Sequence, residues 1–103
     1  MEKLLLGKNA IITGCARGMG HKMMEVFAEH GANLWVCARK QTEQFEHDVK
    51  DLSEKHQVNI IPIYFELTDG EAMKLAVKQI MSFKQPIDIL VNNAGITYNA
   101  LFQ

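Results

Sequence analysis

Three glycines gather near the start of the chain, in segment 13–20, which reads Thr-Gly-Cys-Ala-Arg-Gly-Met-Gly. A chain that leaves a strand here and at once enters a helix needs a residue that is free to take positive φ, and Gly14 meets that need. Gly18 and Gly20 lack the Cβ atoms that would block a phosphate or a closely packed helix. Backbone N–H groups at a helix start can hold phosphate oxygens. The segment therefore predicts a pyrophosphate site built from the loop residues Gly14, Cys15, Ala16, Arg17, Gly18, Met19 and Gly20.

The elements that must hold this loop follow from the apolar pattern around it. Residues 10–13 form a strand-sized apolar run that ends at a glycine, which is typical of a buried strand. The period then becomes helical, and Gly31 is expected to end the helix. The residues predicted to share the apolar face of this helix are Met19, Met23, Val26 and Phe27.

A second strand and helix, and a third strand, follow. Residues 34–37 predict the strand, and residues 41–56 predict the helix. Residues 58–64 predict the third strand, in which Pro62 cannot donate to a ladder and so favours an edge position. The narrow apolar stripe predicted for the helix consists of Phe45, Val49 and Leu52.

The starts of the last predicted helix and strand are each marked by characteristic residues. Thr68 and Glu71 have the form of a capping box, which predicts that Thr68 caps a third helix. Pro86 marks the start of the next element, and residues 87–91 predict a fourth strand. The apolar face predicted for the third helix is wide and consists of Met73, Ala76, Val77, Ile80 and Met81.

The alternation β-α-β-α-β-α-β predicts one domain over residues 1–103, in the α/β class. Right-handed crossovers make the strands parallel and place helices on both faces, as in a Rossmann-type doubly wound sheet. The expected strand order is 3-2-1-4, which puts Pro62 on an edge. Strand 4 would then offer an apolar edge, so we expect the isolated chain to associate through residues 87–91.

Two motifs together resemble the short-chain dehydrogenases/reductases. Segment 13–20 matches T-G-x-x-x-G-x-G, and segment 92–95, Asn-Asn-Ala-Gly, directly follows the fourth predicted strand. The resemblance covers essentially the whole chain. It implies an oxidoreductase whose dinucleotide is contacted on its ribose side by Asn93, Ala94 and Gly95.

Other segments refine this resemblance. Glu66 and Leu67, which lead into Thr68, look like the adenine-side segment of the family, with Glu66 in place of the usual aspartate. Residues 92–97 look most like those of bacterial 3-oxoacyl-[acyl-carrier-protein] reductases, although Tyr98 replaces a residue that is usually charged in that subgroup. Many sugar, steroid and alcohol reductases share the same segment.

The end of the second predicted strand favours NADP(H) over NAD as the cofactor. An acidic residue about 20 positions past the glycine loop accepts hydrogen bonds from the ribose 2′-hydroxyl of NAD. The chain has Cys37-Ala38-Arg39-Lys40 there, with no carboxylate. Arg39 offers a planar charged group suited to a 2′-phosphate, and Arg17 resembles the second basic residue of NADP-preferring members. The alternative is that Arg39 and Lys40 merely begin a solvated helix.

The resemblance also implies catalytic residues that this segment does not contain. In the family a tyrosine acts as general acid, a lysine four residues later lowers its pKa, and an upstream serine orients the substrate carbonyl. Tyr64 and Tyr98 are followed at that distance by Thr68 and Phe102. The catalytic set is therefore expected beyond Gln103, and the chain alone is expected to be inactive.

Composition bounds the remaining choices. Charged residues make up 22% of the chain and the net charge is −1, which gives no reason to expect nucleic acid or an anionic membrane as a partner. No apolar run reaches the length of a membrane span, and no secretory signal is visible, so a cytoplasmic location is expected. Cys15 and Cys37 are expected to be free thiols, a redox pair being the alternative. The four histidines lack metal-ligand spacing.

Three functions remain open on these grounds. The first is an NADP(H)-dependent enzyme, expected to be a homo-oligomer, that acts on a small carbonyl or alcohol substrate. The second is a non-catalytic nucleotide-binding module. The third, a domain that binds S-adenosylmethionine, shares the alternating pattern but does not account for residues 92–95.

Overall fold

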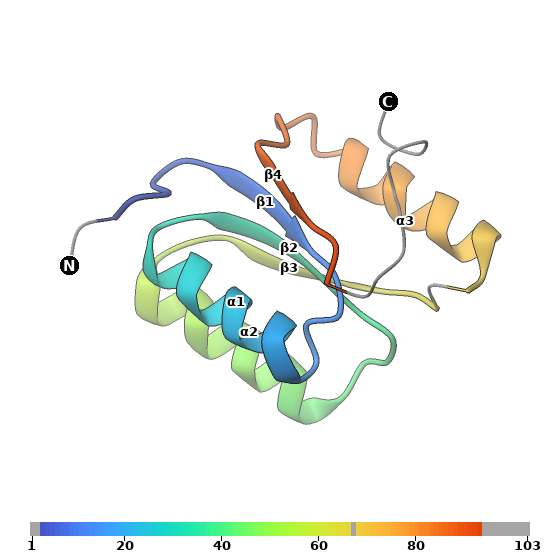
Figure 1. Ribbon diagram of the computed structural model, residues 1–103, viewed down its shortest axis with the longest axis horizontal. Helices are drawn as coiled ribbons and strands as arrows, with labels where there is room; N and C mark the ends of the chain where they lie inside the picture. Colours follow the sequence, from blue (N-terminus) through green and yellow to red (C-terminus); the bar gives the residue numbers. More distant parts are fainter. Residues whose placement is uncertain (1–2, 67, 94–103) are drawn as a thin grey trace.

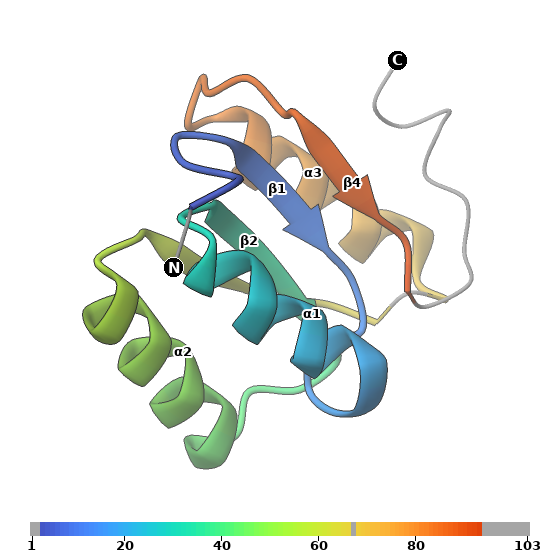
Figure 2. The same ribbon diagram turned by 60° about the vertical axis from the view of Figure 1, so that its left-hand side comes forward.

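A computed structural model describes residues 3–66 and 68–93. Its four strands form one parallel sheet in the order β3-β2-β1-β4. Helices α1 and α2 cover one face of the sheet and α3 covers the other (Figures 1 and 2). The predicted fold class and strand order are confirmed. In chain order the elements are β1 (Asn9–Ile12), α1 (Gly18–Glu29), β2 (Asn33–Ala38), α2 (Glu43–His56), β3 (Ile60–Tyr64), α3 (Gly70–Met81) and β4 (Ile89–Val91).

The sheet divides the core in two because successive side chains of a strand point to opposite faces. In β1, Ala10 and Ile12 belong to the cluster packed beneath α1 and α2, whereas Ile11 belongs to the cluster beneath α3. All three are at most 2% exposed. The unbroken apolar run of β1 therefore matches a central strand that is covered on both faces.

The face that α1 turns to the sheet differs from the predicted one. Met23 and Phe27 are half-buried and pack on the core, but Met19 is 68% exposed. The buried residues of the helix are Gly20, Met24 and Ala28. The prediction followed the large apolar side chains at 19, 23, 26 and 27, whereas the buried line at i, i+4 and i+8 contains one large residue, Met24, between the small residues Gly20 and Ala28. Met19 is thereby left on the outer side of the first turn.

Helix α3 begins one residue later than predicted. Its N-cap is Asp69, whose Oδ1 accepts hydrogen bonds from the backbone N–H groups of Glu71 and Ala72, each at 3.1 Å. The capping-box prediction at Thr68 is wrong, because the aspartate carboxylate accepts these bonds in its place. The predicted apolar face is confirmed at its centre, where Met73, Ala76 and Ile80 are buried, but Met81 is 43% exposed.

Both edges of the described sheet fall where expected. Pro62 lies in β3 and pairs with Val36 of β2 only, so its missing N–H costs no ladder bond on the outer side. Strand β4 is shorter than predicted, and within residues 3–66 and 68–93 it pairs with β1 alone. Its three residues are half-buried. Association through this edge stays a prediction.

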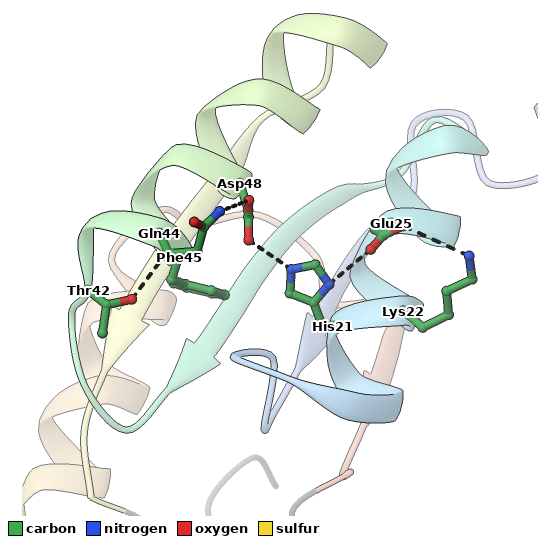
Figure 3. A network of polar contacts seen from close by, with 7 residues as sticks. All are labelled: His21, Lys22, Glu25, Thr42, Gln44, Phe45 and Asp48. Carbon is green, nitrogen blue, oxygen red and sulfur yellow. Dashed lines mark hydrogen bonds and ion pairs between the residues drawn. The ribbon is translucent and has the colours of Figure 1, made fainter.

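A polar network joins the start of α1 to α2 (Figure 3). His21 lies between two carboxylates: its Nδ1 is 2.9 Å from Glu25 Oε1 and its Nε2 is 3.0 Å from Asp48 Oδ2. Gln44 Nε2 donates to the other oxygen of Asp48 at 2.9 Å. Because His21 directly follows Gly20, this network fixes the first turn of α1 against its neighbouring helix.

Removal of the α3 cap should be measurable. Asp69→Ala is expected to lower the free energy of unfolding by about 1 kcal/mol, because two N–H groups of the first turn lose their acceptor. Thr68→Ala is the matched control and should change it by less than about 0.5 kcal/mol, as for an ordinary surface site. Urea denaturation of the two variants checks this. An equal loss in both would restore Thr68 as the cap.

Candidate nucleotide-binding site

The predicted site residues come together at one edge of the sheet. Because the strands are parallel, the loops that follow their carboxyl ends meet there. The glycine loop follows β1, Arg39 follows β2, Glu66 follows β3 and Asn93 follows β4. In Figure 1 these loops lie at the arrowheads of the strands.

The glycine loop is built as the sequence predicts. Gly14 and Gly18 have φ values of 67° and 65°, a backbone region that residues with a Cβ atom avoid. Gly20 is needed for a different reason. A Cβ atom at this position would lie 2.1 Å from the carbonyl oxygen of Gly14, so α1 can start against the turn only if residue 20 has no side chain.

The N-terminus of α1 differs from those of α2 and α3. Thr42 caps α2 and Asp69 caps α3 through their side-chain oxygens. At α1 the N-cap residue Arg17 makes no side-chain cap hydrogen bond, and the first turn holds no acidic residue. The free N–H groups of this turn and the positive end of the helix dipole therefore suit an anion from outside the helix.

Cys15 points inward from the loop rather than toward the solvent. Its side chain is fully buried, its Sγ donates to the carbonyl oxygen of Ile12 at 3.1 Å, and its amide donates to the carbonyl oxygen of Cys37 at 3.0 Å. The Cys15 amide thus ties the loop to β2. Ala16, Arg17, Gly18 and Met19 are exposed, and they form the part of the loop that a phosphate can reach.

Both cysteines are free thiols, as predicted. They lie in the core clusters on opposite faces of the sheet, which disfavours a redox pair. Burial raises the pKa of both thiols: that of Cys37 from 9.0 to about 12, and that of Cys15, which the neighbouring Cys37 raises further, well above its ordinary value. The thiolate is the reactive form, so neither cysteine is suited to be a nucleophile.

The thiols should therefore be inert in the folded protein. At mildly alkaline pH we expect an aromatic disulfide reagent to label neither cysteine until denaturant is added. Because the folded pKa of Cys37 is raised, its contribution to stability is complete below pH 9 and declines as the pH rises toward about 12. Rapid labelling of the native protein would contradict this assignment.

A small cavity lies beside the glycine loop, between the ends of β2 and β3. Its volume is about 110 Å³. At its rim the Arg39 Nε is 2.6 Å from the Glu66 Oε2, and both side chains are substantially exposed, at 73% and 44%. Three predicted site residues thus share one cavity, whose lining consists of Gly14, Cys37, Ala38, Arg39, Phe65 and Glu66.

Phe65 is the lining residue that sequence reasoning missed. It is 8% exposed and belongs to the cluster beneath α3, and its amide donates to the carbonyl oxygen of Ala38 at 3.1 Å. An aromatic residue directly after a strand and before Glu66 was the available signal, since parallel strands present such residues at the ligand edge.

Asn92 and Asn93 connect β4 to the glycine loop. The Asn93 Nδ2 lies 3.4 Å from the Gly14 oxygen, and the Thr13 hydroxyl lies 3.5 Å from the Asn92 Oδ1. The Thr13 amide donates to the Val91 oxygen at 3.0 Å. The two motifs that carried the resemblance are therefore in contact. The other predicted contacts at Leu67, Ala94 and Gly95 lie outside the described residues.

The sheet order and the glycine loop define a Rossmann-type nucleotide-binding domain. Residues 8–103 match the family model for short chain dehydrogenase. The chain belongs to the short-chain dehydrogenase family. None of the helices in the described part of the chain is long and apolar enough to cross a membrane.

Relatives and solved structures agree with this assignment. The chain is 34% identical over 101 residues to the 3-oxoacyl-[acyl-carrier-protein] reductase of Chlamydia muridarum. The aligned residues make up 98% of this chain and 40% of that relative. The structure of L-sorbose reductase from Gluconobacter frateurii, complexed with NADPH and L-sorbose, has a TM-score of 0.80 and 33% identity, covering 93% of this chain and 36% of that one. The hydroxysteroid dehydrogenase of Escherichia coli has a TM-score of 0.73 and 27% identity over 85% of this chain and 37% of its own. The chain thus spans about two fifths of the length of these proteins.

Proposed function

We propose that this chain is the NADP(H)-binding segment of an oxidoreductase that reduces a carbonyl group or oxidises the corresponding alcohol. The observation that carries the proposal is the uncapped, glycine-lined start of α1 beside a cavity whose rim holds Arg39. The helix start supplies N–H donors for the pyrophosphate. Arg39 supplies the positive charge for a 2′-phosphate, and Ala38 leaves no carboxylate to select a 2′-hydroxyl.

The finer assignment concerns the intact protein. Similarity to 3-oxoacyl-[acyl-carrier-protein] reductases favours a 3-oxoacyl thioester as the carbonyl substrate. The contact between the Asn93 Nδ2 and the Gly14 oxygen supports a role for Asn93 on the ribose side of the cofactor. The family resemblance extends this proposed role to Ala94 and Gly95. The near-neutral net charge gives no reason to propose nucleic acid or an anionic membrane as a partner. The family resemblance supports a small carbonyl or alcohol substrate and a second copy of the protein as partners, and we propose a cytoplasmic location.

A matched pair of half-ligands tests the cofactor proposal. On this proposal the described residues contact the adenine, its ribose and the pyrophosphate. The ligands 2′-phospho-ADP-ribose and ADP-ribose differ only in the 2′-phosphate, so the difference in their affinities measures the preference that we assign to Arg39. We expect 2′-phospho-ADP-ribose to bind about tenfold more tightly in a calorimetric titration, a difference of about 1.4 kcal/mol. The amide resonances of residues 16–20 should shift with both ligands. Equal affinities for the two ligands would contradict the proposed preference for NADP(H). Unshifted amide resonances in the loop would contradict the proposed binding site.

The alternative is a nucleotide-binding module without catalysis. Neither Tyr64 nor Tyr98 has a lysine four residues later, which fits both candidates because the chain spans about two fifths of the length of its relatives. The coding sequence that follows residue 103 distinguishes the two candidate functions. A downstream Tyr-x-x-x-Lys supports the oxidoreductase, and its absence from the natural protein supports the module.

A further inference from the structure

The carboxylate of Glu46 joins the loop between β2 and α2 to the sheet. Glu46 lies in the first turn of α2 and is half-buried. Its Oε1 accepts a hydrogen bond from the Tyr64 hydroxyl at 2.6 Å and another from the Gln41 Nε2 at 2.9 Å. Tyr64 is the last residue of β3, and Gln41 belongs to the loop 39–42 that connects β2 to α2. One carboxylate oxygen therefore links this loop to the neighbouring strand.

Capping of α2 does not account for these two hydrogen bonds. An acidic residue in the first turn of a helix ordinarily stabilises the helix itself, through a capping bond or through the helix dipole. In α2 the cap is Thr42, whose Oγ1 accepts from the Phe45 amide at 3.1 Å (Figure 3). Glu43, which is exposed, supplies a second negative charge to the same turn. The bonds from Gln41 and Tyr64 come from outside the helix, so they hold the loop.

The Tyr64 end of this link is fixed by packing and by its protonation state. The ring packs on the core cluster beneath α1 and α2, and its centroid lies 6.1 Å from that of Phe45 with the planes at 75°. Burial raises the pKa of the Tyr64 hydroxyl well above its ordinary value, and the hydrogen bond to Glu46 and the charge of that carboxylate raise it further. The hydroxyl therefore stays a donor at physiological pH, and a hydrogen bond to a charged acceptor is stronger than a neutral one.

The loop that is held in this way carries Arg39. On one side of Arg39 the Ala38 oxygen accepts from the Phe65 amide at 3.1 Å. On the other side Gln41 is bonded to Glu46. The Arg39 side chain itself is 73% exposed. A charged side chain on a loop that is already ordered loses less conformational freedom when it binds a ligand, which raises the affinity.

From these contacts we infer that Glu46 is a positioning residue, which holds the loop of Arg39 through Gln41 and thereby strengthens the preference for a nucleotide with a 2′-phosphate. The inference rests on the proposed NADP(H)-binding function and deepens it. The sign of the effect separates positioning from simple electrostatics. If Glu46 acted by its charge alone, removing the carboxylate would favour a bound phosphate, because like charges repel. Positioning through the loop gives the opposite result.

The ratio of the affinities for 2′-phospho-ADP-ribose and ADP-ribose tests the inference, because a general loss of stability would weaken both ligands alike. In calorimetric titrations we expect Glu46→Ala to reduce the wild-type ratio from about tenfold to about threefold, the effect of losing one modest hydrogen-bonded link. Glu46→Gln keeps a side-chain oxygen that accepts from both donors, so it should retain the wild-type ratio or exceed it. Glu43→Ala is the matched control, since it removes a carboxylate from the same turn, and it should leave the ratio unchanged.

Gln41→Ala gives a second measurement at an exposed position that does not threaten folding. It should lower the ratio as Glu46→Ala does, and the double variant should show no further loss because both substitutions break the same link. Equal affinities of the wild type for the two ligands would overturn the proposed NADP(H) preference together with this inference. A wild-type preference that survives in Glu46→Ala or in Gln41→Ala would overturn the inference alone. So would an equal loss in Glu43→Ala, or a Glu46→Gln variant that loses as much as Glu46→Ala.

Discussion

Replacing Gly20 by alanine is expected to lower the free energy of unfolding by about 3 kcal/mol, the upper end of the usual range for substitutions that force overpacking or backbone shifts, and to abolish nucleotide binding. The new Cβ atom would lie 2.1 Å from the Gly14 oxygen, 2.7 Å from its carbon and 2.8 Å from the Asn93 Nδ2. Two of these atoms are backbone, so no side-chain rotation relieves the clash. The first turn of α1 must move away from the loop, and the anion site would be lost with it.

Two other glycines serve as matched controls. A Cβ atom at Gly70 meets nothing within 4 Å, and Gly70 has no positive φ, so Gly70→Ala at the start of α3 should be neutral or slightly stabilising. Gly18 also has open space but a φ of 65°, so Gly18→Ala should cost about 1 kcal/mol through backbone strain alone. Urea denaturation and an NADPH titration of the three variants check the order. A Gly20→Ala variant as stable as Gly70→Ala would contradict the proposed contact.

The fold could be predicted because each element carries an independent local signal. The alternation of strand and helix along the sequence predicts parallel strands, and Pro62 separately favours an edge position for β3; both predictions agree with the observed sheet. Which side chains of each helix are buried depends on tertiary packing and could not be predicted in full. The buried line of α1 consists of Gly20, Met24 and Ala28, whereas the stripe predicted from the large apolar residues included Met19, which is exposed.

Part of the candidate site could be predicted for the same reason. The loop glycines are dictated by backbone conformation, which sequence spacing reveals. Contacts between loops that follow different strands cannot be predicted from spacing along the sequence. The ion pair of Arg39 with Glu66, the contact of Asn93 with Gly14 and the place of Phe65 in the cavity depend on how the four loops after β1, β2, β3 and β4 meet in space.

Arg39→Asp is expected to reverse the preference between the two cofactors. The wild-type guanidinium offers a charge-assisted fork to a 2′-phosphate, and aspartate would repel that phosphate while accepting from a free 2′-hydroxyl. We expect NADPH affinity to fall about tenfold or more, by the loss of one exposed charge-assisted contact, and NADH to become the better ligand. Fluorescence or calorimetric titrations with both cofactors measure the two affinities. Lys40→Asp makes the same charge change one residue away, outside the cavity lining, and should leave the preference for NADPH in place.

The Arg39–Glu66 ion pair adds a second and opposite expectation. Because the Glu66 Oε2 lies 2.6 Å from the Arg39 Nε, the carboxylate competes with a 2′-phosphate for the same guanidinium. Glu66→Gln removes the competing charge, so NADPH affinity should rise by up to about fivefold, the usual ceiling for an exposed pair, with little change for NADH. In the Arg39→Asp background the same substitution has no guanidinium to release and should not favour NADPH selectively. A gain from Glu66→Gln that survives in that background would mean that Glu66 acts on the phosphate directly, and that Arg39 is not the residue that receives it.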